Sequence, residues 1–386
     1  MAEENNSNSE RSRGTLGEVA REFLRLGFVA FGGPAAHVAM MEERFVRRKN
    51  WLSRERFLDL FGAASLLPGP SSTELAIYLG ELRGGLAGML VSGTSFILPA
   101  ALMVAALAWV YSRYGSVPQM AGLLFGIKPV AVALMAQAIW NLGRTALKSA
   151  WLILLAAAVV AMAVLGLPLL TLLLGAGILW MLIMQGKRVA RHEFTFTQIA
   201  SSSAFALPGT VGLASVFFYF LKIGAVLFGS GYVLLAILRA DLVQRLHWLT
   251  DGQLLDAIAV SQATPGPFFT VATFIGYLLG GWRGAGLATL GMFLPAFVYV
   301  GLTAHILPKL RSSPLASAFL DGVNAAAVAL MAFVGWQFAR ATLINVPAII
   351  LALVSVFLLF RFKVNSAWLV LGGAVAGILL HSLGWA

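Results

Sequence analysis

Two Pro-Gly-Pro turns interrupt long apolar stretches of the sequence, at residues 68–70 and 265–267. Proline lacks an N–H donor and clashes with the preceding helical turn, so neither turn can continue a helix. A new helix therefore starts at residues 71–73 and, after the second turn, near residues 268–270. Helix N-termini offer free N–H groups and a positive dipole end, which bind anions; the alternative is a plain proline kink. We assign to a predicted anion site Pro68, Gly69, Pro70, Ser71, Ser72, Thr73, Pro265, Gly266, Pro267 and Thr270.

Glycine-rich breaks occur in two further segments, at 32–34 and 229–231. Each is either an unwound backbone facing the same cavity or a point where helices pack closely through small residues. A cation precedes each break, Arg25 in one segment and Lys222 in the other. These cations either neutralise a bound anion or extend their charged ends to the membrane interface. We add to the predicted site Arg25, Gly32, Gly33, Lys222, Gly229, Ser230 and Gly231.

Two charged residues stand deeper in apolar stretches. Lys128 lies about 16 Å from the start of its segment at the helical rise, too deep to reach the interface easily. It therefore needs either a protein partner or a bound anion, and we include it among the substrate-binding residues. Glu74 follows the first turn, and burial favours the neutral, proton-carrying form of a carboxylate. Glu74 thus suits proton coupling; the alternative is a salt bridge to Lys128 or Arg25.

The remaining polar residues of the apolar segments have plainer interpretations. Asp59 and Asp256 stand near the starts of their segments, where they are expected to cap helices, and Asp321 is expected to cap another. His37 matches Leu234 in the second half and is expected to be a core or interfacial histidine rather than a ligand.

The segments that carry these residues occur twice in the sequence. Residues 23–27 (FLRLG) reappear as 220–224 (FLKIG), and the Pro-Gly-Pro turns match at the same offset of 197. After one gap, residues 132–136 (VALMA) are repeated unchanged at 328–332. The predicted domains are a polar tail at 1–19, a first repeat at 20–184, a basic linker at 185–212 and a second repeat at 213–386.

Each repeat holds the same apolar segments. The predicted helices cover 20–41 and 213–238, 57–80 and 254–277, 86–112 and 284–307, 117–143 and 318–339, with a two-helix hairpin at 151–184 and 346–384. Loop Lys and Arg residues mark the cytoplasmic side of a membrane protein. The loop at 42–56 is strongly basic and its twin is not, whereas the hairpin turn at 166–168 is uncharged and its twin carries Arg361 and Lys363. This reversal indicates inverted repeats.

The amino-acid composition is typical of an integral membrane protein. Of 386 residues, 59% are hydrophobic and 11% are charged, whereas soluble domains carry about 25% charged residues. We predict an all-α polytopic membrane protein of two inverted repeats, with about 10 spans (range 9–13) plus re-entrant segments broken by Pro-Gly-Pro. The net charge of +11 fits basic loops facing anionic lipid headgroups rather than nucleic acid.

Signatures of enzymes are missing from the sequence. It has no cysteine and no HExxH, GxSxG or P-loop motif. We therefore expect no catalytic residues, no metal site, no cofactor and no ATP-driven activity. The GxxxG patterns permit a homodimer, although fused repeats do not need one.

The duplicated pattern F-L-R/K-x-G-x-x-x-F-G-G/S, then a basic loop ending in W-L, then a Pro-Gly-Pro turn, resembles the chromate ion transporter family. The resemblance is to its long form, with two fused homologous domains, and it covers the chain from about residue 15 onward. The second half departs from the family motif at Ser230 and Tyr232, where the first has Gly33 and Ala35.

The resemblance implies export of chromate, a tetrahedral dianion, across the bacterial inner membrane, with chromate resistance as the result. The driving force would be the membrane potential, proton antiport or both. The alternatives are an anion channel, or a carrier for sulfate or another oxyanion, on the same architecture. The motif residues that the resemblance implicates are Arg25, Gly27, Phe31, Gly32, Gly33, Pro34, Pro68, Gly69 and Pro70 with their second-half twins.

Overall fold

Helices make up every regular element that the computed structural model describes. The described residues are 14–31, 33–114, 118–185, 212–227, 233–304, 314–362 and 364–384. The breaks fall where the sequence predicts them, so each glycine-rich segment forms two helices and each Pro-Gly-Pro turn separates two more. The predicted Gly32, Gly229, Ser230 and Gly231 lie outside the described residues.

The first repeat runs from the N-terminal helix to the first two-helix hairpin. Its elements are α2 (Leu16–Val29), α3 (Gly33–Met41), the π-helix η1 (Glu42–Arg48), α4 (Arg54–Ala64), α5 (Ser71–Tyr114), α6 (Pro118–Ala146), α7 (Ala150–Val164) and α8 (Leu169–Gln185).

The second repeat follows the same order. Its elements are α9 (Leu213–Val226), α10 (Val233–Leu238), η2 (Arg239–Arg245), α11 (Asp251–Ala263), the 3₁₀ turn η3 (Phe268–Thr270), α12 (Val271–Thr303), α14 (Pro314–Thr342), α15 (Val346–Phe357), η4 (Leu358–Phe362) and α16 (Ser366–Ser382).

The helices α5 and α12 are each folded back on themselves at a glycine. Gly85 has φ +60° and Gly281 has φ +59°, a left-handed conformation that glycine adopts without strain. The two legs of each hairpin then touch through glycines, Gly80 against Gly88 in α5 and Gly276 against Gly284 in α12. A side chain at these contacts would collide with the opposite backbone, so the close packing depends on glycine.

Four helices are long and apolar enough to cross a membrane: α5, α6, α12 and α14. Shorter apolar helices accompany them, namely α7, α8, α9, α16 and the continuous run of α15 with η4. This set makes the protein an all-α, multi-pass membrane protein, as the composition predicts.

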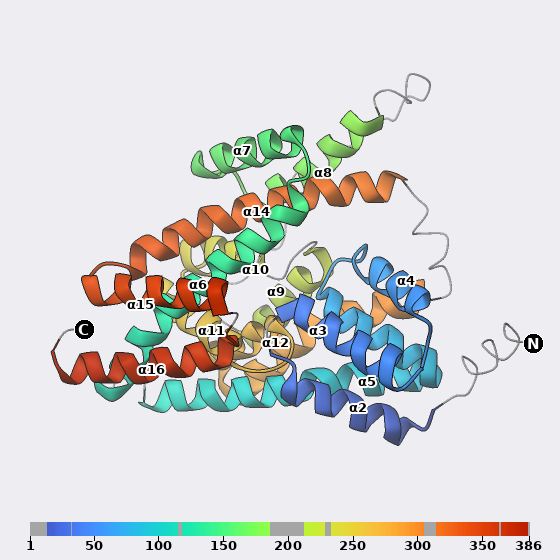
Figure 1. Ribbon diagram of the computed structural model, residues 1–386, viewed down its shortest axis with the longest axis horizontal. Coiled ribbons are helices and arrows are strands. Elements are labelled where there is room, and N and C mark those ends of the chain that lie inside the picture. Colours follow the sequence, from blue (N-terminus) through green and yellow to red (C-terminus); the bar gives the residue numbers. More distant parts are fainter. Residues whose placement is uncertain are drawn as a thin grey trace, which may run out of the picture.

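Packing divides the protein into two bodies, each built from both repeats (Figure 1). In the core body, α2 packs along α5, α9 along α12, and α5 against α12. In the scaffold body, α6 packs against α14. The hairpins are exchanged between repeats: α7 and α8 pack on α14, whereas α15 and α16 pack on α6.

Equivalent helices of the two repeats run in opposite directions (Figure 1). The helix α8 runs to the right toward the linker, whereas its counterpart α16 runs to the left toward the C-terminus. The scaffold helices α6 and α14 are opposed in the same way. The repeats are therefore inverted, in agreement with the reversal of loop charge.

The predicted caps at the three aspartates are wrong. Ser53 caps α4 and Thr250 caps α11, each accepting a hydrogen bond from a backbone N–H at 3.2 Å. Asp59 and Asp256 lie within those helices. Asp321 lies within α14 and pairs with Lys148 at 3.3 Å. The hydroxyls of Ser53 and Thr250 lie just before α4 and α11, where they can accept from the free N–H groups of the first helical turn.

Candidate substrate site

The two Pro-Gly-Pro turns dock reciprocally onto the opposite repeat. The N–H of Gly69 donates to the carbonyl of Leu227 at the end of α9, and the N–H of Gly266 donates to the carbonyl of Ala30 at the end of α2, both at 2.8 Å. Each turn therefore meets the break in the first segment of its partner repeat. The predicted broken segments come together at the centre of the core body.

Both turn glycines are required by geometry. Gly69 has φ +134° and Gly266 has φ +94°. A Cβ at Gly69 would lie 2.6 Å from an oxygen of Glu74, and a Cβ at Gly266 would lie 2.6 Å from the Cβ of Ala100. The interlock between the repeats therefore depends on glycine at both positions.

In the first repeat, the helix that starts after the turn presents buried polar side chains. Ser72, Thr73 and Glu74 are at most 3% exposed, in the first turn of α5. Within the described structure, neither Glu74 oxygen nor the hydroxyl of Thr73 has a hydrogen-bond partner. The predicted alternative of a salt bridge from Glu74 is not formed, because Lys128 pairs elsewhere and Arg25 is exposed.

His37 links the start of α5 to the carbonyl on which the second turn docks. Its Nε2 lies 3.0 Å from the carbonyl of Ala30, the same carbonyl that accepts the N–H of Gly266. A carbonyl only accepts, so Nε2 carries the proton and Nδ1 of the neutral ring accepts the Ser72 hydroxyl at 3.3 Å. His37 is buried at 1% exposure, as expected for a core histidine, and it positions Ser72.

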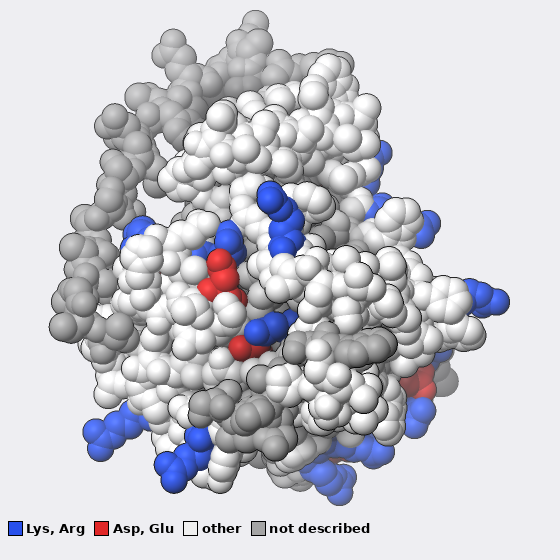
Figure 2. All heavy atoms as spheres, turned by 90° about the vertical axis from the view of Figure 1, so that its left-hand side faces the viewer, with Lys and Arg blue, Asp and Glu red and all other residues white. Residues whose placement is uncertain are grey.

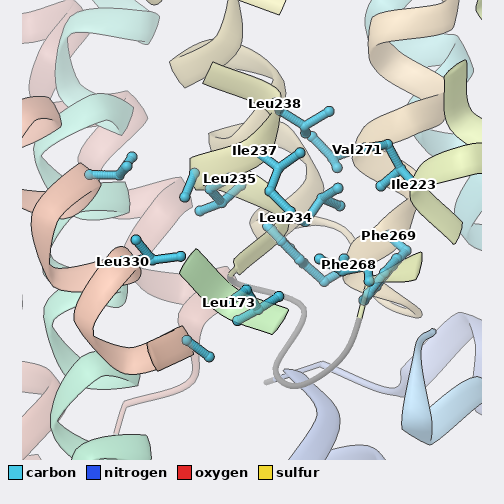
Figure 3. Packing of buried hydrophobic residues seen from close by; sticks show 14 of the residues in the cluster. Leu173, Ile223, Leu234, Leu235, Ile237, Leu238, Phe268, Phe269, Val271 and Leu330 are labelled. Atoms are coloured by element: carbon cyan, nitrogen blue, oxygen red, sulfur yellow. The ribbon is translucent and has the colours of Figure 1, made fainter. Parts of the chain in front are cut away.

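In the second repeat, the corresponding positions are apolar. Leu234 replaces His37, Phe269 replaces Ser72 and Val271 replaces Glu74, and all three are buried. Figure 3 shows them packed with Phe268 and Ile223. Thr270, the counterpart of Thr73, donates its hydroxyl to the carbonyl of Pro267 at 2.8 Å. Apolar side chains therefore fill the space beside the second Pro-Gly-Pro turn.

Arg25 and Lys222 lie at the surface of α2 and α9 and not at the buried centre. Arg25 lines an open groove of about 320 Å³ together with Glu43 and Arg44. Lys222 interacts with Asp241 of η2, where burial raises the pKa of the Asp241 carboxyl and the charges of Arg245 and Lys222 oppose that rise. Their exposure favours the interfacial alternative for both cations.

Lys128 has a protein partner that the sequence analysis missed. Its Nζ lies 3.2 Å from one oxygen of Asp256, and the hydroxyl of Tyr111 donates to the other at 2.9 Å. The signal for this pair was a second charge, Asp256, within an apolar segment of the opposite repeat. The end of the molecule at the left of Figure 1 carries further charges, and Figure 2 shows acidic and basic side chains close together near its middle.

A charged network also fastens the start of the first repeat. The buried Glu22 pairs with Arg44 at 2.6 Å and with Lys49 at 3.1 Å. Lys49 also pairs with Glu18 at 2.9 Å, and this hydrogen bond raises the pKa of the Lys49 ammonium. The network holds η1 and the loop after it against α2. No group of three potential metal ligands occurs among the described residues.

Two inverted repeats whose broken helices meet between them are an arrangement typical of membrane transporters. The comparison with known proteins agrees, because the chromate transporter family matches residues 17–181 and again 214–378. The chain belongs to this family, and it is a transporter and not an enzyme.

Several curated relatives carry names of the same kind. A chromate transport protein of Cupriavidus metallidurans is 34% identical, covering 96% of this chain and 94% of the relative. A chromate transport protein of Pseudomonas aeruginosa is 32% identical, covering 94% and 92%. A probable chromate transport protein of Synechococcus elongatus is 29% identical, covering 95% and 96%. No solved structure matches the chain.

Proposed function

We propose that this protein exports chromate from the bacterial cytoplasm across the inner membrane and thereby confers chromate resistance. The observation that carries the proposal is the reciprocal docking of the two Pro-Gly-Pro turns, which brings both broken segments of each repeat to one place. Broken helices facing each other between inverted repeats are where secondary transporters bind their substrates.

The substrate site in this proposal consists of the two turns with the first helical turn of α5. The start of α5 supplies N–H groups and a positive dipole end to a dianion. Ser71 and Thr73 supply hydroxyl donors, and Gly33 supplies backbone. Ser72 and Thr270 line the site, with their hydroxyl protons donated to His37 and to the carbonyl of Pro267. The exposed Arg25 and Lys222 attract the anion toward the protein, and Lys128 receives it near the surface.

The membrane potential favours this direction of transport. The cytoplasm is negative inside, and moving one charge across 100 mV contributes about 2.3 kcal/mol, so a dianion gains about 4.6 kcal/mol. Proton antiport would add to this driving force. Glu74 is the residue proposed to carry the proton, because a carboxylate buried without a cation is stable as the neutral acid.

A second candidate function is a carrier or channel for sulfate or another oxyanion. Sulfate and chromate have the same tetrahedral shape and charge. A helix N-terminus binds the negative charge of an anion and does not distinguish sulfur from chromium at its centre.

The test is uptake of labelled chromate and labelled sulfate into inside-out vesicles under an imposed, inside-positive potential. Chromate uptake that exceeds sulfate uptake is expected. Uptake of sulfate without chromate would identify sulfate as the substrate instead. Uptake of neither anion would contradict the proposal. Unitary currents in planar bilayers would identify a channel.

A further inference from the structure

The ion pair between Lys128 and Asp256 is unequal in its exposure. The Lys128 side chain is 28% exposed, whereas that of Asp256 is 4% exposed. Tyr111 holds the second oxygen of Asp256 from within the protein. An anion from solution can therefore reach the lysine, while the carboxylate stays fixed behind it.

This pair joins the two bodies of the protein. Lys128 belongs to α6 of the scaffold, and Tyr111 belongs to α5 of the core. Asp256 lies on α11, which packs against both α6 of the scaffold and α12 of the core. On this side α11 packs against α6 and α16, and α10 packs against α14. The equivalent helices of the first repeat are α3 and α4. In the described structure their main contacts are with α5 and η1 of the core.

The two members of the pair have chemically different counterparts in the other repeat. The counterparts of Asp256 and Lys128 are Asp59 and Asn324, so the cation is present in one repeat only. Inverted repeats exchange conformations when a transporter alternates its access. The contact between α11 and α6 is therefore the one that must open, and the ion pair lies across it.

A dianion and the Asp256 carboxylate compete for the same ammonium group. Leaving either charge of a buried pair without a partner is strongly unfavourable, so opening the contact requires a replacement for Asp256 at Lys128. An oxyanion provides that replacement, and the Tyr111 hydroxyl continues to bind the carboxylate. Asp256 lies about 13 Å along α11 from Pro265, so this position is separate from the turns.

We propose that Lys128 and Asp256 form an exchangeable ion pair, in which the transported oxyanion displaces Asp256 from Lys128 and thereby releases α11 from α6. The inference rests on the proposed transport of an oxyanion. It makes Asp256 a positioning residue that acts through Lys128, and it makes Lys128 an anion-binding residue outside the central site.

The test compares the KM for chromate in vesicles for Asp256→Asn and Lys128→Gln. Removing the competing carboxylate should lower KM about fivefold or more, within the usual range of coupling between sites, whereas removing the cation should raise KM by a similar factor. The fraction of protein that reaches the membrane changes the maximal rate and not KM. Effects on KM in the same direction for both variants would overturn the proposal.

The double variant Lys128→Gln with Asp256→Asn guards against misfolding, because it leaves no unpaired buried charge. The proposal predicts that its KM stays raised, as in Lys128→Gln. A wild-type KM in the double variant would show that the pair is only structural and would overturn the proposal. If wild-type vesicles take up no chromate, the proposed function fails instead.

The matched control is the exposed pair Lys148 and Asp321, which are 3.3 Å apart. Both partners are on the scaffold side of the molecule. The variants Lys148→Gln and Asp321→Asn should leave KM unchanged. A shift in KM equal to that of the buried pair would show a general charge effect and would also overturn the proposal.

Discussion

The two repeats share a backbone and differ in the chemistry of their side chains. Both have a Pro-Gly-Pro turn docked on the opposite repeat and a hairpin folded at a left-handed glycine. Beside the first turn lie His37, Ser72 and Glu74, whereas the second turn has Leu234, Phe269 and Val271. The two turns therefore share their backbone geometry, but only the first has these polar side chains beside it.

This difference assigns separate roles to the two turns. The second turn has apolar neighbours, and the Thr270 hydroxyl is bonded within the turn, so this turn is suited to hold the two repeats together. The first turn has polar neighbours, and Glu74 lacks a hydrogen-bond partner in the described structure, so this turn is suited to bind or carry charge. A second difference concerns α2 and α9: the buried Glu22 pairs with Arg44 in the first repeat, whereas the equivalent positions in the second repeat are Tyr219 and Asp241.

The largest effect is expected where the repeats are alike. Gly69→Ala and Gly266→Ala should each reduce chromate transport at least about tenfold, because a Cβ collides and a left-handed φ is strained. Uptake into vesicles measures the loss. Gly286→Ala, which meets no atom within 4 Å, is the control. If only one of the two variants lost transport, the two docked turns would not be equally important for transport.

An intermediate effect on stability is expected where the repeats differ. His37→Leu installs the second-repeat residue and leaves the buried Ser72 hydroxyl without its partner, so the free energy of unfolding should fall by about 1–3 kcal/mol. Thermal unfolding of purified protein measures this change. The control Leu234→Met conserves volume in an apolar site and should cost less, under about 1.5 kcal/mol. Equal losses would argue against a specific role for the histidine.

The smallest effect is expected at the exposed cations. Arg25→Gln and Lys222→Gln should raise KM only about twofold, and added salt should erase the difference because it screens surface charge. Transport assays at low and high ionic strength measure this. Complete loss of transport in either variant would place that cation in the binding site and contradict its surface location.

The sequence predicted the elements of this fold because its signals are local. Proline and glycine dictate the breaks at 68–70 and 265–267, and the repeat fixes equivalent segments in both halves. It could not predict that the hairpins exchange between repeats, since helix-to-helix packing depends on long-range contacts. For the same reason it gave Lys128 no partner, and Asp256 was taken for a cap although Thr250 fills that role.

Coupling to protons is assigned to Glu74, in the helix that starts after the first Pro-Gly-Pro turn. The direct test is chromate uptake into inside-out vesicles with and without an imposed proton gradient, at a clamped potential, for wild type and Glu74→Gln. We expect the gradient to stimulate wild-type uptake and to have no effect on Glu74→Gln, which still responds to potential. Stimulation that persists in Glu74→Gln would contradict this assignment.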